Sequence, residues 1–133
     1  MSDCSLTSLD TAKGSHLPVT PNFKSNLTAR YKFDWSGLQN YVQAAAVHQT
    51  SSTPSIENFQ NIQEGKIPGY TSADFAVGTG AGNWHMEAFI DNAFDSRAEI
   101  SRFTECGTVD CGTNYRSFII KPRILGLKFG QKF

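Results

Sequence analysis

An excess of charge of either sign is missing from this chain. Its 133 residues include 12 Lys and Arg and 12 Asp and Glu, so the formal net charge is zero. A nucleic-acid-binding protein would carry a basic excess and an acidic disordered tail an acidic one, so we expect neither, and no nucleic-acid partner. Charged residues make up only 18% of the chain, against about 25% in ordinary soluble domains.

Long hydrophobic runs are missing as well. No stretch of about 18 apolar residues occurs, so the sequence predicts no transmembrane helix. The N-terminal residues Met1-Ser2-Asp3-Cys4 show neither the basic region nor the apolar region of a signal peptide, which we therefore do not expect. The chain is thus expected to be either cytosolic or part of a longer chain whose signal lies elsewhere.

A convergent set of catalytic or metal-binding residues is also missing. His85 and Glu87, followed by Cys106 and Cys111, match a zinc-deaminase site only faintly, because that site needs a Cys-x-x-Cys pair preceded by proline. We expect no zinc site, no cofactor and no enzymatic activity.

Aromatic and small polar residues are plentiful, and their order along the chain indicates strands. From Phe23 to Phe33 every even position is polar, whereas the odd positions are apolar or aromatic apart from Ser25. This alternation is the period of a β-strand that has one apolar and one polar face.

Four further segments complete a pattern of strands. The sequence predicts strands at residues 23–33, 38–49, 69–78, 84–93 and 122–133, with short turns at 34–37 and 79–83 and long loops at 50–68 and 94–121. It therefore predicts an all-β protein, an antiparallel up-and-down meander of about five strands over residues 23–133. Short turns that alternate with long external loops are the rule in outer-membrane barrels, so residues 1–22 are expected to be an N-terminal external loop segment.

Strand length and aromatic placement fit a membrane barrel. A strand of about eleven residues, tilted by about 45°, covers roughly 25 Å, the height of the apolar band of such a barrel. Aromatic residues near predicted strand ends fit the two interfacial girdles; they are Phe23, Tyr31, Phe33, Tyr41, Tyr70, Trp84 and Phe133. A small soluble all-β binding module, with its apolar faces packed together, would share much of this pattern and is the alternative.

Three segments carry a resemblance to a known family. They are residues 17–24 (LPVTPNFK), 91–97 (DNAFDSR) and 122–133 (PRILGLKFGQKF). In this order and at this spacing they resemble the C-terminal end of TonB-dependent outer-membrane receptors. The resemblance extends over roughly residues 17 to 133.

The resemblance implies the C-terminal part of a large transmembrane β-barrel in the outer membrane of a Gram-negative bacterium. Such receptors contain an N-terminal plug and take up iron-siderophores, vitamin B12 or carbohydrates with energy delivered through TonB. This chain has no plug and no TonB-contacting segment, and five strands cannot close a barrel. The resemblance therefore implies a partial barrel whose partners are membrane lipid and the remaining barrel and plug of the receptor. It also implies that TonB is reached only through the N-terminal part of the receptor, and that this chain alone is no transporter.

The resemblance also assigns roles to individual residues. The last strand would be the signal read by the barrel assembly machinery, through Gly126, Leu127, Phe129 and Phe133. The lipid-facing candidates are Leu27, Tyr31, Phe75, Trp84, Met86, Ile90 and Leu125. The lumen-facing candidates are Lys24, Arg30, Lys32, Asp74, His85, Glu87, Asp91 and Lys128.

The cysteines are the last candidates. Cys106 and Cys111 lie in the second long loop, which faces outside in this topology. An oxidising compartment would favour a disulfide between them, and two free thiols in a loop are the alternative. Cys4 has no assigned role.

Overall fold

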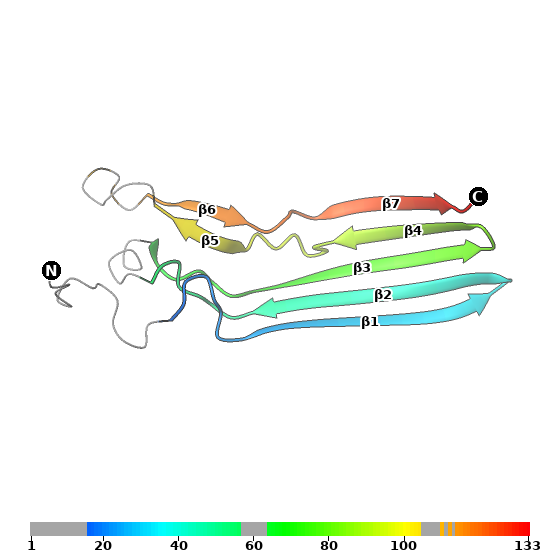
Figure 1. The fold of residues 1–133 in the computed structure, drawn as a ribbon, viewed down its shortest axis with the longest axis horizontal. Coiled ribbons are helices and arrows are strands. Elements are labelled where there is room, and N and C mark those ends of the chain that lie inside the picture. The colour runs from blue at the N-terminus through cyan, green and yellow to red at the C-terminus, as the bar shows by residue number, and fades with distance from the viewer. Residues whose placement is uncertain (1–15, 57–63, 105–109, 111, 113) are drawn as a thin grey trace, which may run out of the picture.

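The fold is a single antiparallel sheet with a small hairpin beyond one end (Figure 1). The computed structural model describes residues 16–56, 64–104, 110, 112 and 114–133. The sheet has the strand order β1-β2-β3-β4-β7, with β1 Lys24–Trp35, β2 Leu38–Gln49, β3 Tyr70–Ala81, β4 Trp84–Asp91 and β7 Ile124–Gln131. The predicted all-β meander of five strands is confirmed, and the sheet is not closed into a barrel.

Two tight turns connect the strands at one end of the sheet. The β1–β2 turn consists of Ser36 and Gly37, with φ of 53° and 75°. Two consecutive positive φ values define the type I′ turn, whose twist matches that of the flanking strands. Both turns are shorter than predicted, since β1 continues through Trp35 and β3 through Ala81. The strands keep pairing until only two residues remain to reverse the chain.

A second sheet lies within the predicted second long loop. Strands β5 Glu99–Phe103 and β6 Arg116–Ile119 form an antiparallel pair beyond the ends of β4 and β7 (Figure 1). The prediction of residues 94–121 as a loop without strands was therefore wrong in part. A register shift between Glu99 and Ser101 interrupts the alternation of β5, and strands this short carry a weak periodic signal.

The register of the sheet brings the apolar positions of all five strands onto one face. One row across the strands is Tyr31, Val42, Val77, Ala88 and Leu127, joined by successive pairings. Since directly opposed residues point to the same side of a sheet, the alternation of each strand reinforces that of its neighbour. The result is one continuous apolar face and one continuous polar face.

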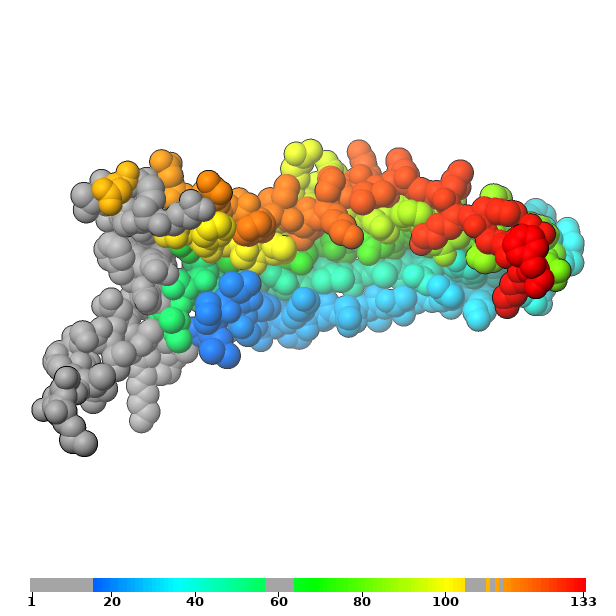
Figure 2. Space-filling view, turned by 45° about the horizontal axis from the view of Figure 1, so that its top comes forward, coloured from blue at the N-terminus to red at the C-terminus, as the bar shows by residue number. Residues whose placement is uncertain are grey.

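No second layer covers either face in the described part of the chain. Every residue of β1 is exposed, and Leu127 on β7 is 77% exposed. In the space-filling view the strands lie as adjacent bands of colour from blue to red (Figure 2). Among the described residues the only buried hydrophobic side chain is Ile67, which lies outside the sheet. The sheet is held together by strand pairing, without a hydrophobic core of its own.

The long-loop end of the molecule holds the few buried groups. Ile67 pairs with Ser52 by two backbone hydrogen bonds of 2.9 and 3.1 Å. Arg102 of β5 donates to the backbone oxygen of Glu64 at 2.7 Å, and its guanidinium also pairs with Glu99. The hairpin is thereby joined to the loop that connects β2 and β3.

Candidate functional site

The apolar face gathers every lipid-facing candidate. The register places them all on one side of the sheet: Leu27, Tyr31, Phe75, Trp84, Met86, Ile90 and Leu125. Leu27 is 73% exposed and Leu125 is 74% exposed. Trp35, predicted to lie in a turn, joins this face at the end of β1 and is also 73% exposed. The face is an open hydrophobic surface that extends across the whole sheet.

The polar face gathers every lumen-facing candidate. The register places on it Lys24, Arg30, Lys32, Asp74, His85, Glu87, Asp91 and Lys128. Tyr41 also lies there, paired with Lys32 on one side and Gly78 on the other. The prediction of Tyr41 and Tyr70 as parts of an interfacial aromatic girdle was therefore wrong, because their strand positions point them to the polar side.

A chain of contacts crosses the polar face from β1 to β7. Arg30 Nε donates to Gln43 Oε1 at 2.7 Å, and its guanidinium lies 4.5 Å from the centre of the Tyr41 ring. Tyr41 Oη donates to Glu87 Oε2, and Lys128 Nζ donates to Glu87 Oε1 at 2.8 Å. We call this set, Arg30, Gln43, Tyr41, Glu87 and Lys128, the transverse network. It joins all of the strands of the sheet except β3, over which it passes.

The transverse network can pass over β3 because Gly78 has no side chain. A Cβ at position 78 would overlap the ring of Tyr41. Glycines at 126 and 130 are matched in the same way, since a Cβ there would overlap the rings of Phe89 and His85. In each pair the ring and the glycine are directly opposed on neighbouring strands. The polar face therefore has rings seated over glycines.

These contacts favour a sheet that curves toward its polar face. Neighbouring strands lie about 4.8 Å apart, so β2 and β4 are separated by roughly twice that distance. The side chains of Tyr41 and Glu87 bridge this separation and meet in a hydrogen bond above β3. Such a bond on one face alone draws the two flanking strands together on that side. Because the glycines on this face have no side chains, fewer side-chain atoms are crowded together when the sheet bends toward it. We expect the polar face to be the concave one.

The long-loop end of the sheet is fixed by Asn92, which directly follows β4. Asn92 is 5% exposed and has a φ of 48°. Its side-chain Nδ2 donates to the backbone oxygens of Ser96 and Lys121, each at 2.9 Å, and its Oδ1 accepts from the Ser96 N–H at 2.9 Å. Asp74 Oδ1 accepts from the Asn92 N–H at 2.7 Å. The Asn92 side chain thus joins the segment that leads into the hairpin to the segment that returns to β7, and the Asn92 backbone N–H holds both to Asp74 of β3.

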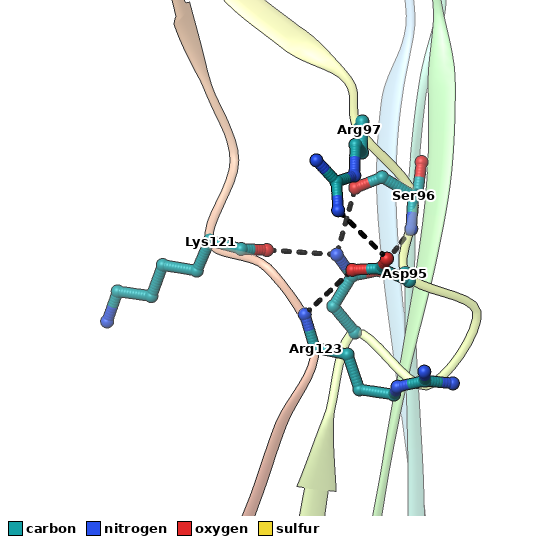
Figure 3. Close-up of polar contacts among 6 residues, drawn as sticks. Asp95, Ser96, Arg97, Lys121 and Arg123 are labelled. Carbon is teal, nitrogen blue, oxygen red and sulfur yellow. Dashed lines mark hydrogen bonds and ion pairs between the residues drawn. The ribbon is translucent and has the colours of Figure 1, made fainter.

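Asp95 adds a second link at the same place. The carboxylate of Asp95 accepts from the Arg123 backbone N–H at 3.1 Å and lies 3.5 Å from the Arg97 guanidinium. Figure 3 shows Asp95 between Arg97 on one segment and Arg123 on the other. The Arg123 hydrogen bond, with a smaller contribution from the charge of Arg97, lowers the pKa of this carboxyl group below its usual value. We did not predict these roles from the sequence, although residues 91–97 carried part of the resemblance.

The remaining candidates are placed as follows. Leu127 and Phe129 lie in β7 on the apolar face, Gly126 lies beneath the Phe89 ring, and Phe133 follows the strand in full exposure. Their role as an assembly signal stays a prediction. Cys106 and Cys111, with Cys4, lie outside the described residues.

Two further features were sought in the described part of the chain. Within it, no three His, Cys, Asp or Glu residues are grouped to hold a metal ion. No described helix is long and apolar enough to span a membrane. Comparison with protein-family models, with curated proteins and with solved structures gives no match for this chain.

Replacing Gly78 by Ala tests the seat beneath Tyr41. We expect the free energy of unfolding in detergent micelles to fall by about 1–3 kcal/mol, because the new methyl group displaces the ring. In a Tyr41→Ala background the same Gly78→Ala change should cost little, since no ring remains to be displaced. Guanidinium titrations followed by tryptophan fluorescence measure the loss of unfolding free energy in both backgrounds. Equal losses would contradict the packing of the Tyr41 ring against Gly78.

Asn92 offers a second test at the long-loop end of the sheet. Asn92→Ala removes the amide and leaves a residue that disfavours positive φ, so we expect a loss of about 2–4 kcal/mol of unfolding free energy. Asn92→Gly removes the same amide but tolerates the backbone angle, so it should be less destabilising. Thermal unfolding followed by circular dichroism ranks the variants. An Asn92→Ala variant as stable as the natural chain would show that the amide contacts contribute nothing.

The pKa of Asp95 predicts a pH dependence. The group has a lower pKa in the folded than in the unfolded chain, so its stabilising effect is present above the unfolded pKa and is lost as the pH falls through the folded value. An NMR titration of the Asp95 carboxyl carbon should give a folded pKa below 3.8, its usual value. A value at or above this would show that the Arg123 hydrogen bond does not form in solution.

Proposed function

We propose that this chain is the C-terminal five-stranded part of the β-barrel of a TonB-dependent outer-membrane receptor. Such a receptor takes up a ligand such as an iron-siderophore, vitamin B12 or a carbohydrate. The observation that carries the proposal is the continuous apolar face, which spans five strands and is covered by no described part of the chain. The opposite face is polar and contains the transverse network.

The apolar face requires a hydrophobic neighbour. Soluble domains bury the apolar face of a sheet against a second layer, and monomers rarely expose large contiguous apolar patches. Here Tyr31, Leu127 and Phe129 are 67%, 77% and 70% exposed on one face. Hydrocarbon chains of a lipid bilayer provide the cover that such a face lacks.

The dimensions of the longer strands support the same neighbour. Strands β1, β2 and β3 have 12 residues each. At about 3.3 Å per residue and a tilt of about 45°, such a strand rises roughly 28 Å, close to the apolar band of an outer-membrane barrel. Trp35 and Trp84 lie next to the two short turns, where aromatic side chains are favoured at the membrane interface.

The two open edges support a partial barrel. Strands β1 and β7 each have one neighbour in the sheet, so about half of their backbone N–H and C=O groups point outward without a partner strand. In hydrocarbon each unsatisfied group costs several kcal/mol. Strands from the remaining barrel would pair with both edges, and a plug would lie against the polar face. We therefore propose that the chain is no transporter by itself.

The family assignment within this proposal rests on the resembling segments. Residues 17–24 lead into β1, and residues 122–133 contain β7. Residues 91–97 begin at the last residue of β4 and include Asn92 and its partner Ser96. In the proposal, recognition of β7 by the barrel assembly machinery places the chain in the outer membrane. TonB acts only through the part of the receptor that lies outside this chain.

Membrane insertion is the test of this function. We expect the purified chain to aggregate in buffer alone and to give a β-sheet circular-dichroism spectrum in detergent micelles or liposomes, where the open edges of β1 and β7 can pair between copies of the chain. A monomeric chain that is fully soluble without detergent and unfolds cooperatively would contradict the proposal and favour a soluble binding module.

A matched pair of variants tests which face meets lipid. Ala29 and Thr28 are neighbours in the middle of β1 and lie on the apolar and polar faces respectively. Ala29→Lys should make insertion into liposomes less favourable by about 2–4 kcal/mol, because a charge near the midplane meets hydrocarbon. Thr28→Lys should have little effect. Equal effects of the two variants would show that lipid does not distinguish the faces.

A further inference from the structure

The polar face contains a hollow near the short-turn end of the sheet. It has a volume of about 620 Å³ and is lined by residues of β1 to β4, the Gly82–Asn83 turn and Lys132. Gly80 lies between Gln39 and His85 in one row across the strands. The His85 ring is directed over Gly130, away from Gly80. A Cβ at Gly80 would meet the Trp84 backbone oxygen at 2.8 Å, so glycine allows β3 and β4 to approach closely beside the hollow.

The charges around the hollow are mostly positive. Arg30, Lys32 and Lys132 line it, against Asp34 as the one acidic residue. Arg30 belongs to the transverse network. By contrast, neither Lys32 nor Lys132 has an ion-pair partner among the described residues. A locally basic surface in a chain of zero net charge attracts an anionic partner.

We propose that this hollow binds an acidic peptide segment that lies inside the barrel. The proposal rests on the proposed function, in which the polar face lines the interior. Lys32 and Lys132 would pair with carboxylates of the peptide, and the side chains of Gln39 and Asn83 offer amides for hydrogen bonds to its backbone. A lipid is a poor occupant, because the basic residues Arg30 and Lys32 of the hollow lie on the face opposite to the apolar surface.

Binding of a defined peptide tests the proposal. The probe is a fluorescein-labelled peptide of alternating glutamate and serine, and the control is the same peptide with glutamine for glutamate. Fluorescence anisotropy with the complete chain folded in a zwitterionic detergent should show binding of the acidic peptide alone, weakened by added salt. The double variant Lys32→Glu, Lys132→Glu should weaken binding by about tenfold or more, because attraction is replaced by repulsion.

A second double variant controls for overall charge. Lys24→Glu with Lys121→Glu makes the same change in net charge at the external end of the sheet, and we expect binding to change by less than about twofold. Lys32→Gln with Lys132→Gln is the milder form if the first variant does not fold. The inference would be overturned if both Lys→Glu double variants weakened peptide binding equally, or if the natural chain folded in detergent did not bind the acidic peptide. A chain that is fully soluble without detergent would instead overturn the proposed function.

Discussion

Backbone hydrogen bonding between neighbouring strands is the interaction on which the rest of this structure depends. In most domains strand pairing is accompanied by burial of an apolar face against a second layer. Here the described residues provide no such layer, and Ile67 is the only buried hydrophobic side chain among them. The arrangement is stable only where a hydrophobic environment covers the apolar face and partner strands pair with the edges of β1 and β7. The proposed membrane barrel satisfies both requirements.

The two faces of the sheet are built on different principles. The apolar face carries large side chains that project freely, as suits a surface in contact with fluid hydrocarbon. The polar face carries rings that lie over Gly78, Gly126 and Gly130, so its side chains lie close to the backbone. The Tyr41–Glu87 hydrogen bond then joins strands that are not neighbours. This asymmetry favours curvature in the direction that closure of the proposed barrel requires.

The ends of the sheet differ as much as its faces. At the short-turn end two residues reverse the chain, and strand pairing alone determines the geometry. At the other end the chain leaves the sheet for long segments, and side-chain contacts replace strand pairing. Asn92 is central there because its amide reaches Ser96 and Lys121, which belong to segments far apart in sequence. The short hairpin β5–β6 is held in place from this point and through Arg102.

The sequence by itself determined the fold class, the number of strands in the sheet and the face to which most strand residues belong, although not the place of Trp35 in β1. It could do so because the alternation from Phe23 to Phe33 recurs in the later strands, and a period of two specifies a face directly. Only the tertiary structure decided the register, and with it the partners of Tyr41 and Glu87, because pairing between strands is not encoded in any one strand. It also decided the role of Asn92 and the existence of the β5–β6 hairpin. Those depend on contacts between distant segments, and such contacts leave no periodic signal in the sequence.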